Sequence, residues 1–137
     1  DMSGFNLRSI RQLASAEVAI KDTDGNPTGV VFELAGPEHP DRKRIAHKIA
    51  RKQVRQYNKT GRTELMDPEE MESMKAENLA AYTLGWKGYV DDSGAPVPFS
   101  KAAALELYRD PEMAWLVDQL DTALGDNELF IRRSVAT

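Results

Sequence analysis

The sequence contains no cysteine, and this absence excludes disulfide bonds, thiol catalysis and cysteine-ligated zinc. Histidine is almost as scarce: His39 and His47 lie on either side of Pro40, without the spacing of a helical metal-binding pair. We expect His39, in a loop with two prolines, to be solvated and inert. No apolar run approaches the roughly 20 residues of a membrane-spanning helix, and the first residues lack a secretory signal pattern.

Motifs of enzymatic sites are also missing. The sequence has no Walker loop, no dinucleotide-binding glycine fingerprint and no nucleophile elbow. Adjacent carboxylates, such as Glu69 with Glu70 and Asp91 with Asp92, lie in polar surroundings that offer no apolar pocket to raise a pKa. We therefore expect a protein that is not an enzyme, with no catalytic residue, no metal site and no cofactor.

Residues 22–33 match part of the EF-hand calcium-binding loop. The residues at four of its ligand positions are Asp22, Asp24, Asn26 and Glu33. Position six needs glycine for a sharp turn, but here it is Pro27. The flanking residues also have strand character, where an EF-hand has helices. The pattern therefore favours a plain β-hairpin turn.

What is present is a globular composition. The 137 residues carry a net charge of −4, and 41% of them are hydrophobic, which suits a single domain and argues against disorder of the whole chain. Residues 1–14 are expected to be weakly ordered. We find no internal repeat and no domain linker.

Turn and capping signals predict the order of elements. Strands are expected at 17–21 and 29–34, joined as a hairpin, and at 86–90 and 97–99, where Pro96 and Pro98 confine the second arm to an edge. Asp41, Asp67, Ser100, Asp110 and Asp126 each precede a helical pattern and are expected to cap its start. The predicted fold is α+β and mainly helical: an N-terminal β-hairpin and a second short hairpin packed with four to five α-helices.

The helix expected at 41–58 has two contrasting halves. We assign its apolar half to the core: Ile45, Ala46, Ile49, Ala50, Val54 and Tyr57. The opposite half is basic, with Arg44, His47, Lys48, Arg51, Lys52 and Arg55, and residues 42–62 hold nine Lys or Arg and no acid. This basic face (42–59) suits phosphate contact in a nucleic-acid-binding protein. Alternatively, it is a solvated helix face that lies opposite the acidic residues 63–82 of the same chain or of another copy.

Two apolar features stand apart from the predicted core. Trp115 points away from the core stripe of its helix, which comprises Met113, Leu116, Val117, Leu120 and Leu124. It either fills a gap under a loop or is an exposed anchor for a protein partner. The cluster of Leu129, Phe130 and Ile131 is too short to bury itself, so it either docks on its own chain or binds a partner.

Local phrases at 22–30, 32–36, 79–88, 96–100 and 115–120 follow one another in a particular order along the predicted elements. In these phrases and in the order of elements, from residue 17 to about 130, the sequence resembles the tail assembly chaperones of long-tailed bacteriophages and prophages. The most specific part of the resemblance is the phrase Gly-Trp-x-Gly at 85–88 followed by Pro-Phe-Ser at 98–100.

The resemblance implies a non-enzymatic assembly factor in the host bacterial cytoplasm. Such proteins bind the helical tape measure protein, keep it soluble and help tail tube subunits assemble around it. Contact with a tape measure helix is assigned to Trp115, Leu129, Phe130 and Ile131, and self-association is expected. The alternatives are another small structural tail or connector protein, or a nucleic-acid-binding protein that uses the basic face.

Overall fold

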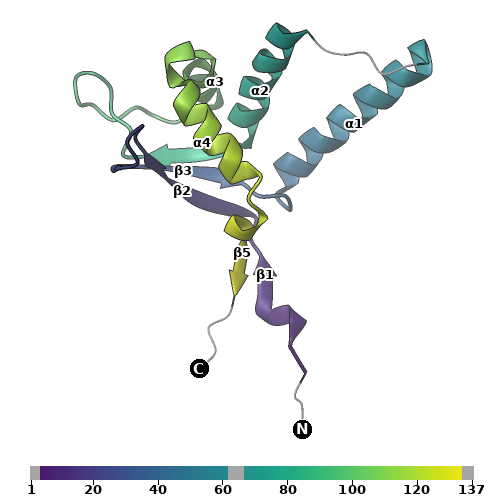
Figure 1. The fold of residues 1–137 in the computed structure, drawn as a ribbon, viewed down its shortest axis with the longest axis horizontal. Helices are drawn as coiled ribbons and strands as arrows, with labels where there is room; N and C mark the ends of the chain where they lie inside the picture. Colours follow the sequence, from purple (N-terminus) through teal and green to yellow (C-terminus); the bar gives the residue numbers. More distant parts are fainter. Residues whose placement is uncertain (1–3, 62–66, 134–137) are drawn as a thin grey trace.

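The computed structural model describes residues 4–61 and 67–133, which form a small sheet covered by helices, with one helix projecting from it (Figure 1). The described strands are β1 (Ile10–Gln12), β2 (Ser15–Lys21), β3 (Pro27–Ala35), β4 (Thr83–Lys87) and β5 (Ile131–Arg133). The described α-helices are α1 (Pro40–Thr60), α2 (Pro68–Tyr82), α3 (Lys101–Arg109) and α4 (Ala114–Leu124). Short 3₁₀ helices are η1 (Leu7–Ser9), η2 (Pro111–Met113) and η3 (Asn127–Phe130).

The predicted α+β, mainly helical fold class is confirmed. Strands β2, β3 and β4 form an antiparallel sheet in that order, and α2, α3 and α4 cover one face of it (Figure 1). The alternation of β3 directs Phe32 and Leu34 into the core, where they meet the apolar residues of the three helices. In α4, the predicted core residues Leu116, Val117, Leu120 and Leu124 are all buried.

Four of the five predicted helix caps are confirmed. The side chains of Asp67, Ser100, Asp110 and Asp126 each accept a hydrogen bond from a backbone N–H in the first turn that follows. The prediction for Asp41 is wrong because the cap is His39, two residues earlier, and the helix starts at Pro40. Proline suits this first position because it has no N–H to leave unpaired.

The second hairpin is shorter than predicted. Strand β4 begins at Thr83, directly after α2, and the returning arm makes a single bridge between Val90 and Pro96. The indole of Trp86 holds this loop: its Nε1 donates to the carbonyl of Val97 at 2.9 Å, and its ring meets that of Phe99 with centroids 4.9 Å apart. The two most specific phrases of the resemblance are therefore in contact with each other.

The two ends of the described chain lie side by side. Strands β1 and β5 pair antiparallel and form a two-stranded ribbon that extends from the body (Figure 1). No strand was predicted in either segment. Both strands are only three residues long, and each is paired by a partner at the far end of the sequence, so no local pattern marks them.

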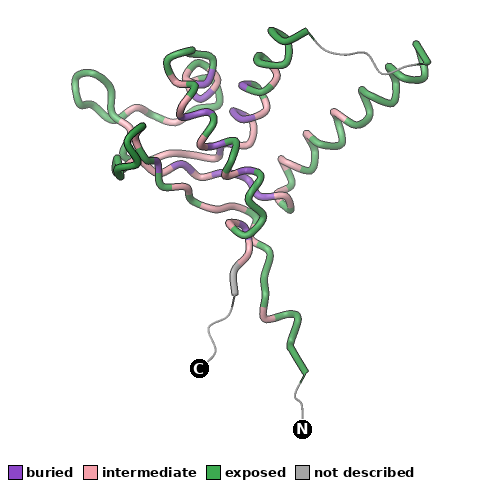
Figure 2. Tube along the Cα trace, in the orientation of Figure 1, coloured by how far each residue is buried: buried purple, intermediate pink, exposed green. Residues whose placement is uncertain are grey.

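The predicted burial of α1 is wrong. None of its residues is buried, and every residue from Ala50 to Thr60 is exposed (Figure 2). Of the residues assigned to the core, Ile45 and Ile49 are half-buried, whereas Val54 is 58% exposed and Tyr57 57% exposed. The helix has the predicted amphipathic pattern, but among the described residues its apolar half is covered only in part, near Ile45 and Ile49, and is left exposed from Ala50 onward.

Candidate functional site

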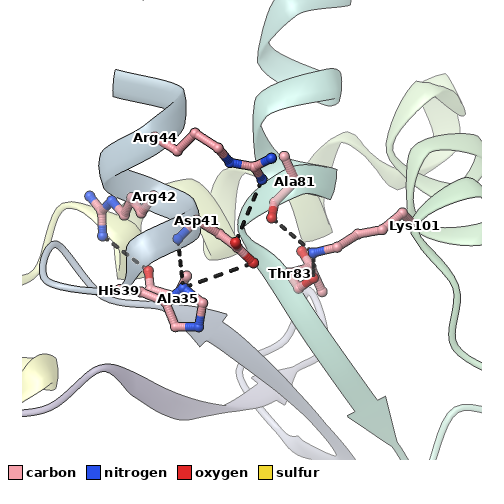
Figure 3. A network of polar contacts seen from close by, with 8 residues as sticks. All are labelled: Ala35, His39, Asp41, Arg42, Arg44, Ala81, Thr83 and Lys101. Carbon is pink, nitrogen blue, oxygen red and sulfur yellow. Dashed lines mark hydrogen bonds and ion pairs between the residues drawn. The ribbon is translucent and has the colours of Figure 1, made fainter. Parts of the chain in front are cut away.

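The most distinctive surface of the molecule is α1, and a compact junction at its base fixes its direction (Figure 3). His39 is part of this junction, which corrects the expectation of a solvated, inert side chain. Its Nδ1 accepts a hydrogen bond from the backbone N–H of Asp41 at 3.1 Å, and its side chain is only 20% exposed. A histidine nitrogen here does what an Asn or Asp oxygen does at most helix starts.

Arg42 joins the base of α1 to the core. Its guanidinium donates to the carbonyl oxygens of Ala35, at the end of β3, and Leu124, at the end of α4, at 3.2 and 3.1 Å. It also lies 5.5 Å from the ring centre of Tyr82 and 5.8 Å from that of Phe130. One side chain thus connects α1 to three other elements and to the segment after α4.

The role of Arg42 was not predicted from the sequence, although its position on the helical wheel indicates one. It shares a helix face with Ile45 and Ile49, three and seven residues further on, so it is a cation on the apolar half of the wheel. A cation in that position either buries its stem or forms specific hydrogen bonds. Here it does the latter.

The other side of the junction is formed by Lys101. Its Nζ donates to the carbonyl oxygens of Ala81, at 2.8 Å, and Thr83, at 2.5 Å, which lie at the C-terminal end of α2 (Figure 3). Burial lowers the pKa of Lys101, and the nearby Asp41 carboxylate opposes that shift. Asp41 itself pairs with Arg44 at 3.5 Å.

Beyond the junction, α1 presents two surfaces that are largely exposed. We define the apolar stripe as Ile45, Ala46, Ile49, Ala50, Val54 and Tyr57, and the basic face as Arg44, Lys48, Arg51, Lys52 and Arg55. The residues of the basic face are all exposed, and Arg44 alone among them has an ion pair with a described residue. A shallow hollow of about 350 Å³ between stripe and basic face is lined by α1 residues only: Ala50, Arg51, Val54 and Arg55.

Helix α2 diverges from α1 and carries the opposite charge (Figure 1). Its exposed half includes Glu69, Glu70, Met71 and Glu72. Its one cation, Lys75, is used elsewhere, with its Nζ at 3.5 Å from Asp118 and 3.8 Å from Asp121 of α4. Among the described residues, no ion pair joins α1 to α2, so the basic face is not neutralised by its neighbour.

The residues assigned from the sequence to partner binding lie on other elements than α1: Trp115 on α4, Leu129 and Phe130 on η3, and Ile131 on β5. Phe130 is fully buried, so docking on its own chain fits the structure and the assignment of Phe130 to partner contact does not. Its ring packs so closely on Gly36 that a Cβ there would lie 2.8 Å from it. Leu129 and Ile131 are half-buried, which favours docking of this cluster on its own chain.

Trp115 takes the position of a gap-filling side chain. It is half-buried and packs against the core. With Ile20, Val30, Tyr89 and Met113, among others, it lines a small apolar pocket of about 120 Å³. Of the two interpretations of Trp115, the gap under a loop therefore fits the structure better.

The hairpin turn interpretation of the incomplete EF-hand pattern is confirmed. One side-chain oxygen of Asp22 accepts hydrogen bonds from the backbone N–H groups of Asp24 and Asn26, which closes the turn between β2 and β3. Across residues 4–61 and 67–133 no group of three or more potential ligands is arranged to hold a metal ion. Within the same residues no helix has both the length and the apolar character to cross a membrane.

Comparison with known protein families links the chain to prophage proteins. A family model described as YdaY prophage protein matches residues 41–123, which is more than half of the chain and runs from the first turn of α1 almost to the end of α4. Neither a curated protein nor a solved structure matches the chain. The match supports a phage-associated role, but the description of the family does not indicate a function in tail assembly.

Proposed function

The chain belongs to the YdaY prophage protein family, and from this premise we propose that it is a tail assembly chaperone without enzymatic activity. In this proposal it acts in the host bacterial cytoplasm, binds the tape measure protein, keeps it soluble and promotes assembly of tail tube subunits around it. The resemblance at 17–130 supports this function, and the prophage family is consistent with it.

The observation that carries the proposal is the outer part of the apolar stripe of α1, which is exposed from Ala50 to Tyr57. An amphipathic helix in a small domain normally gains its stability by burying its apolar face. Here Val54 and Tyr57 are more than half exposed on a helix that projects from the body. Such a stripe suits reversible capture of another amphipathic helix, which is the conformation expected of a tape measure segment.

We therefore assign binding of the tape measure protein, the client, to α1 in place of the residues assigned from the sequence. Phe130 is part of the core, and Trp115 is half-buried and packs against the core. A capture surface must be accessible before the client arrives, and the stripe satisfies this condition with an aromatic side chain, Tyr57, of the kind that concentrates interface energy.

The test is co-expression with the tape measure protein of the same prophage. Val54→Ser with Tyr57→Ser should abolish its solubilisation, because both side chains are lost from the stripe. The variant should keep its circular dichroism spectrum, since neither residue is buried. Val90→Ser is the matched control: Val90 is also exposed, at 49%, but lies away from α1 and should leave solubilisation unchanged. Wild-type solubilisation by the double variant would contradict the proposal.

A further inference from the structure

The charge around the apolar stripe narrows the kind of helix that α1 can accept. From Arg42 to Gly61 every charged residue is Lys or Arg. Lys48, Arg51, Lys52 and Arg55 are exposed, and none of them pairs with an acidic side chain in the described part of the chain. A helix that lies along the stripe comes within the range of these cations, because the Debye length at physiological salt is about 8 Å.

We propose that α1 selects an amphipathic helix whose apolar residues are flanked by Asp or Glu. This inference rests on the proposed function and specifies the chemistry of the client at the same surface. Carboxylates beside the client's apolar face would meet Lys48 and Lys52 at one border of the stripe and Arg51 at the other. A client flanked by Lys or Arg would place like charges together, which costs affinity.

The geometry of α1 favours a helix over nucleic acid as the occupant. Phosphate binding would use the basic face alone and leave the stripe uncovered. Lys and Arg can instead lay their apolar stems along a bound helix while their charged groups reach its acidic flanks. The hollow lined by Ala50, Arg51, Val54 and Arg55 combines both surfaces in one place, with apolar and cationic side chains side by side.

The experiment compares two synthetic helical peptides with identical apolar residues, one flanked by Glu and one by Lys. Binding to the wild-type chain is followed by fluorescence anisotropy. The acidic peptide should bind at least about tenfold more tightly at low salt. The difference should disappear near 1 M salt, where the Debye length is about 3 Å. Equal affinity for both peptides at low salt would overturn the proposal.

Two sets of variants separate this inference from the proposed function. Lys48→Glu, Arg51→Glu and Arg55→Glu together should reverse the preference, so that the Lys-flanked peptide binds more tightly. The matched control replaces the exposed cations Arg11, Lys21 and Lys87, which lie off α1, with Glu and should keep the original preference. Val54→Ser with Tyr57→Ser should weaken the binding of both peptides to the same extent.

If neither peptide binds the wild-type chain, α1 does not capture helices, and this result contradicts both the inference and the proposed function. If both bind without charge preference, helix capture stands and only the acidic selectivity fails. A DNA duplex that binds α1 more tightly than the acidic peptide, with the affinity lost in the Lys48, Arg51 and Arg55 variant, would replace the proposal with nucleic-acid binding.

Discussion

At the scale of single residues, the buried hydroxyl groups of Thr83 and Tyr108 form hydrogen bonds inside the core. Thr83, at the junction of α2 and β4, is fully buried, and its hydroxyl lies 2.7 Å from both the carbonyl oxygen of Leu79 and the hydroxyl of Tyr108. The hydroxyl of Tyr108 is also buried, and among the described residues no buried side-chain polar atom lacks a partner.

This arrangement predicts a loss of stability at alkaline pH. Burial raises the pKa of the Tyr108 hydroxyl far above its usual value, so the folded chain keeps this proton while the unfolded chain loses it above a pH of about 10. Tyr108 therefore leaves the free energy of unfolding unchanged below that pH and lowers it as the pH rises beyond it. Urea denaturation on both sides of pH 10 measures the effect.

Tyr108→Phe is the comparison for this prediction. The variant should show a smaller loss of stability with rising pH than the wild-type chain. The loss should not vanish, because burial also raises the pKa of Tyr82, against the opposing charge of Arg42. Identical pH dependence in the two chains would show that the Tyr108 hydroxyl ionises as freely in the folded state as in the unfolded one.

At the scale of elements, Arg42 supplies the polar links between the first turn of α1 and the core. Its guanidinium hydrogen-bonds Ala35 and Leu124 and contacts two aromatic rings. Ile45 and Ile49, further along the helix, are half-buried, and the residues from Ala50 to Thr60 are exposed. Arg42→Ala should therefore lower the free energy of unfolding by about 1.5–3 kcal/mol, the range for hydrogen bonds to a charged group.

Arg44→Ala provides the matched control for Arg42→Ala. Arg44 lies two residues away, its side chain is 72% exposed, and its pair with Asp41 is a surface ion pair, which is worth about 1 kcal/mol or less. Chemical denaturation of both variants compares the two sites. Equal shifts would contradict the role of Arg42 as the anchor of α1.

Local sequence signals predicted most elements but not their packing. The hairpin of β2 and β3, the caps at Asp67, Ser100, Asp110 and Asp126, and the core stripe of α4 follow from patterns within a few residues. A helical wheel shows which half of a helix is apolar, but it does not show whether another element covers that half. The apolar half of α4 is covered by the sheet, whereas the apolar half of α1 is left exposed from Ala50 onward.

The missed features depend on contacts between distant parts of the sequence. Arg42 reaches a carbonyl 82 residues away, and β1 pairs with β5 across almost the whole chain. Phe130 enters the core because Gly36, far from it in the sequence, leaves room for its ring. No local period encodes such contacts, so the candidate site could be recognised from the sequence as an amphipathic, basic helix but not as a free one.

At the scale of the whole molecule, the separation of charge between α1 and α2 predicts weak self-association. The exposed half of α2 carries Glu69, Glu70 and Glu72 beside Met71, which is the same combination of acidic and apolar groups that we propose for the client. A second copy can therefore place its α2 against α1 when no client is present. The contact is mainly between exposed charges, so it should weaken as salt rises.

Light scattering over a range of chain concentrations tests this prediction. The average mass should exceed that of a monomer at high concentration and low salt and should return to the monomer as salt is added. The Lys48, Arg51 and Arg55 to Glu variant should remain monomeric under the same conditions. An average mass equal to that of a monomer at every salt concentration would contradict the prediction of self-association.

The central claim is that residues 50–60 of α1 form an uncovered helix that a client covers, and amide hydrogen exchange tests it most directly. In the free chain these amides should exchange much faster than those of β3, because no packing protects them. Addition of the tape measure protein or the Glu-flanked peptide should slow exchange at 50–60 and leave β3 unchanged. Core-like protection of 50–60 in the free chain, or client protection confined to other elements, would contradict the account.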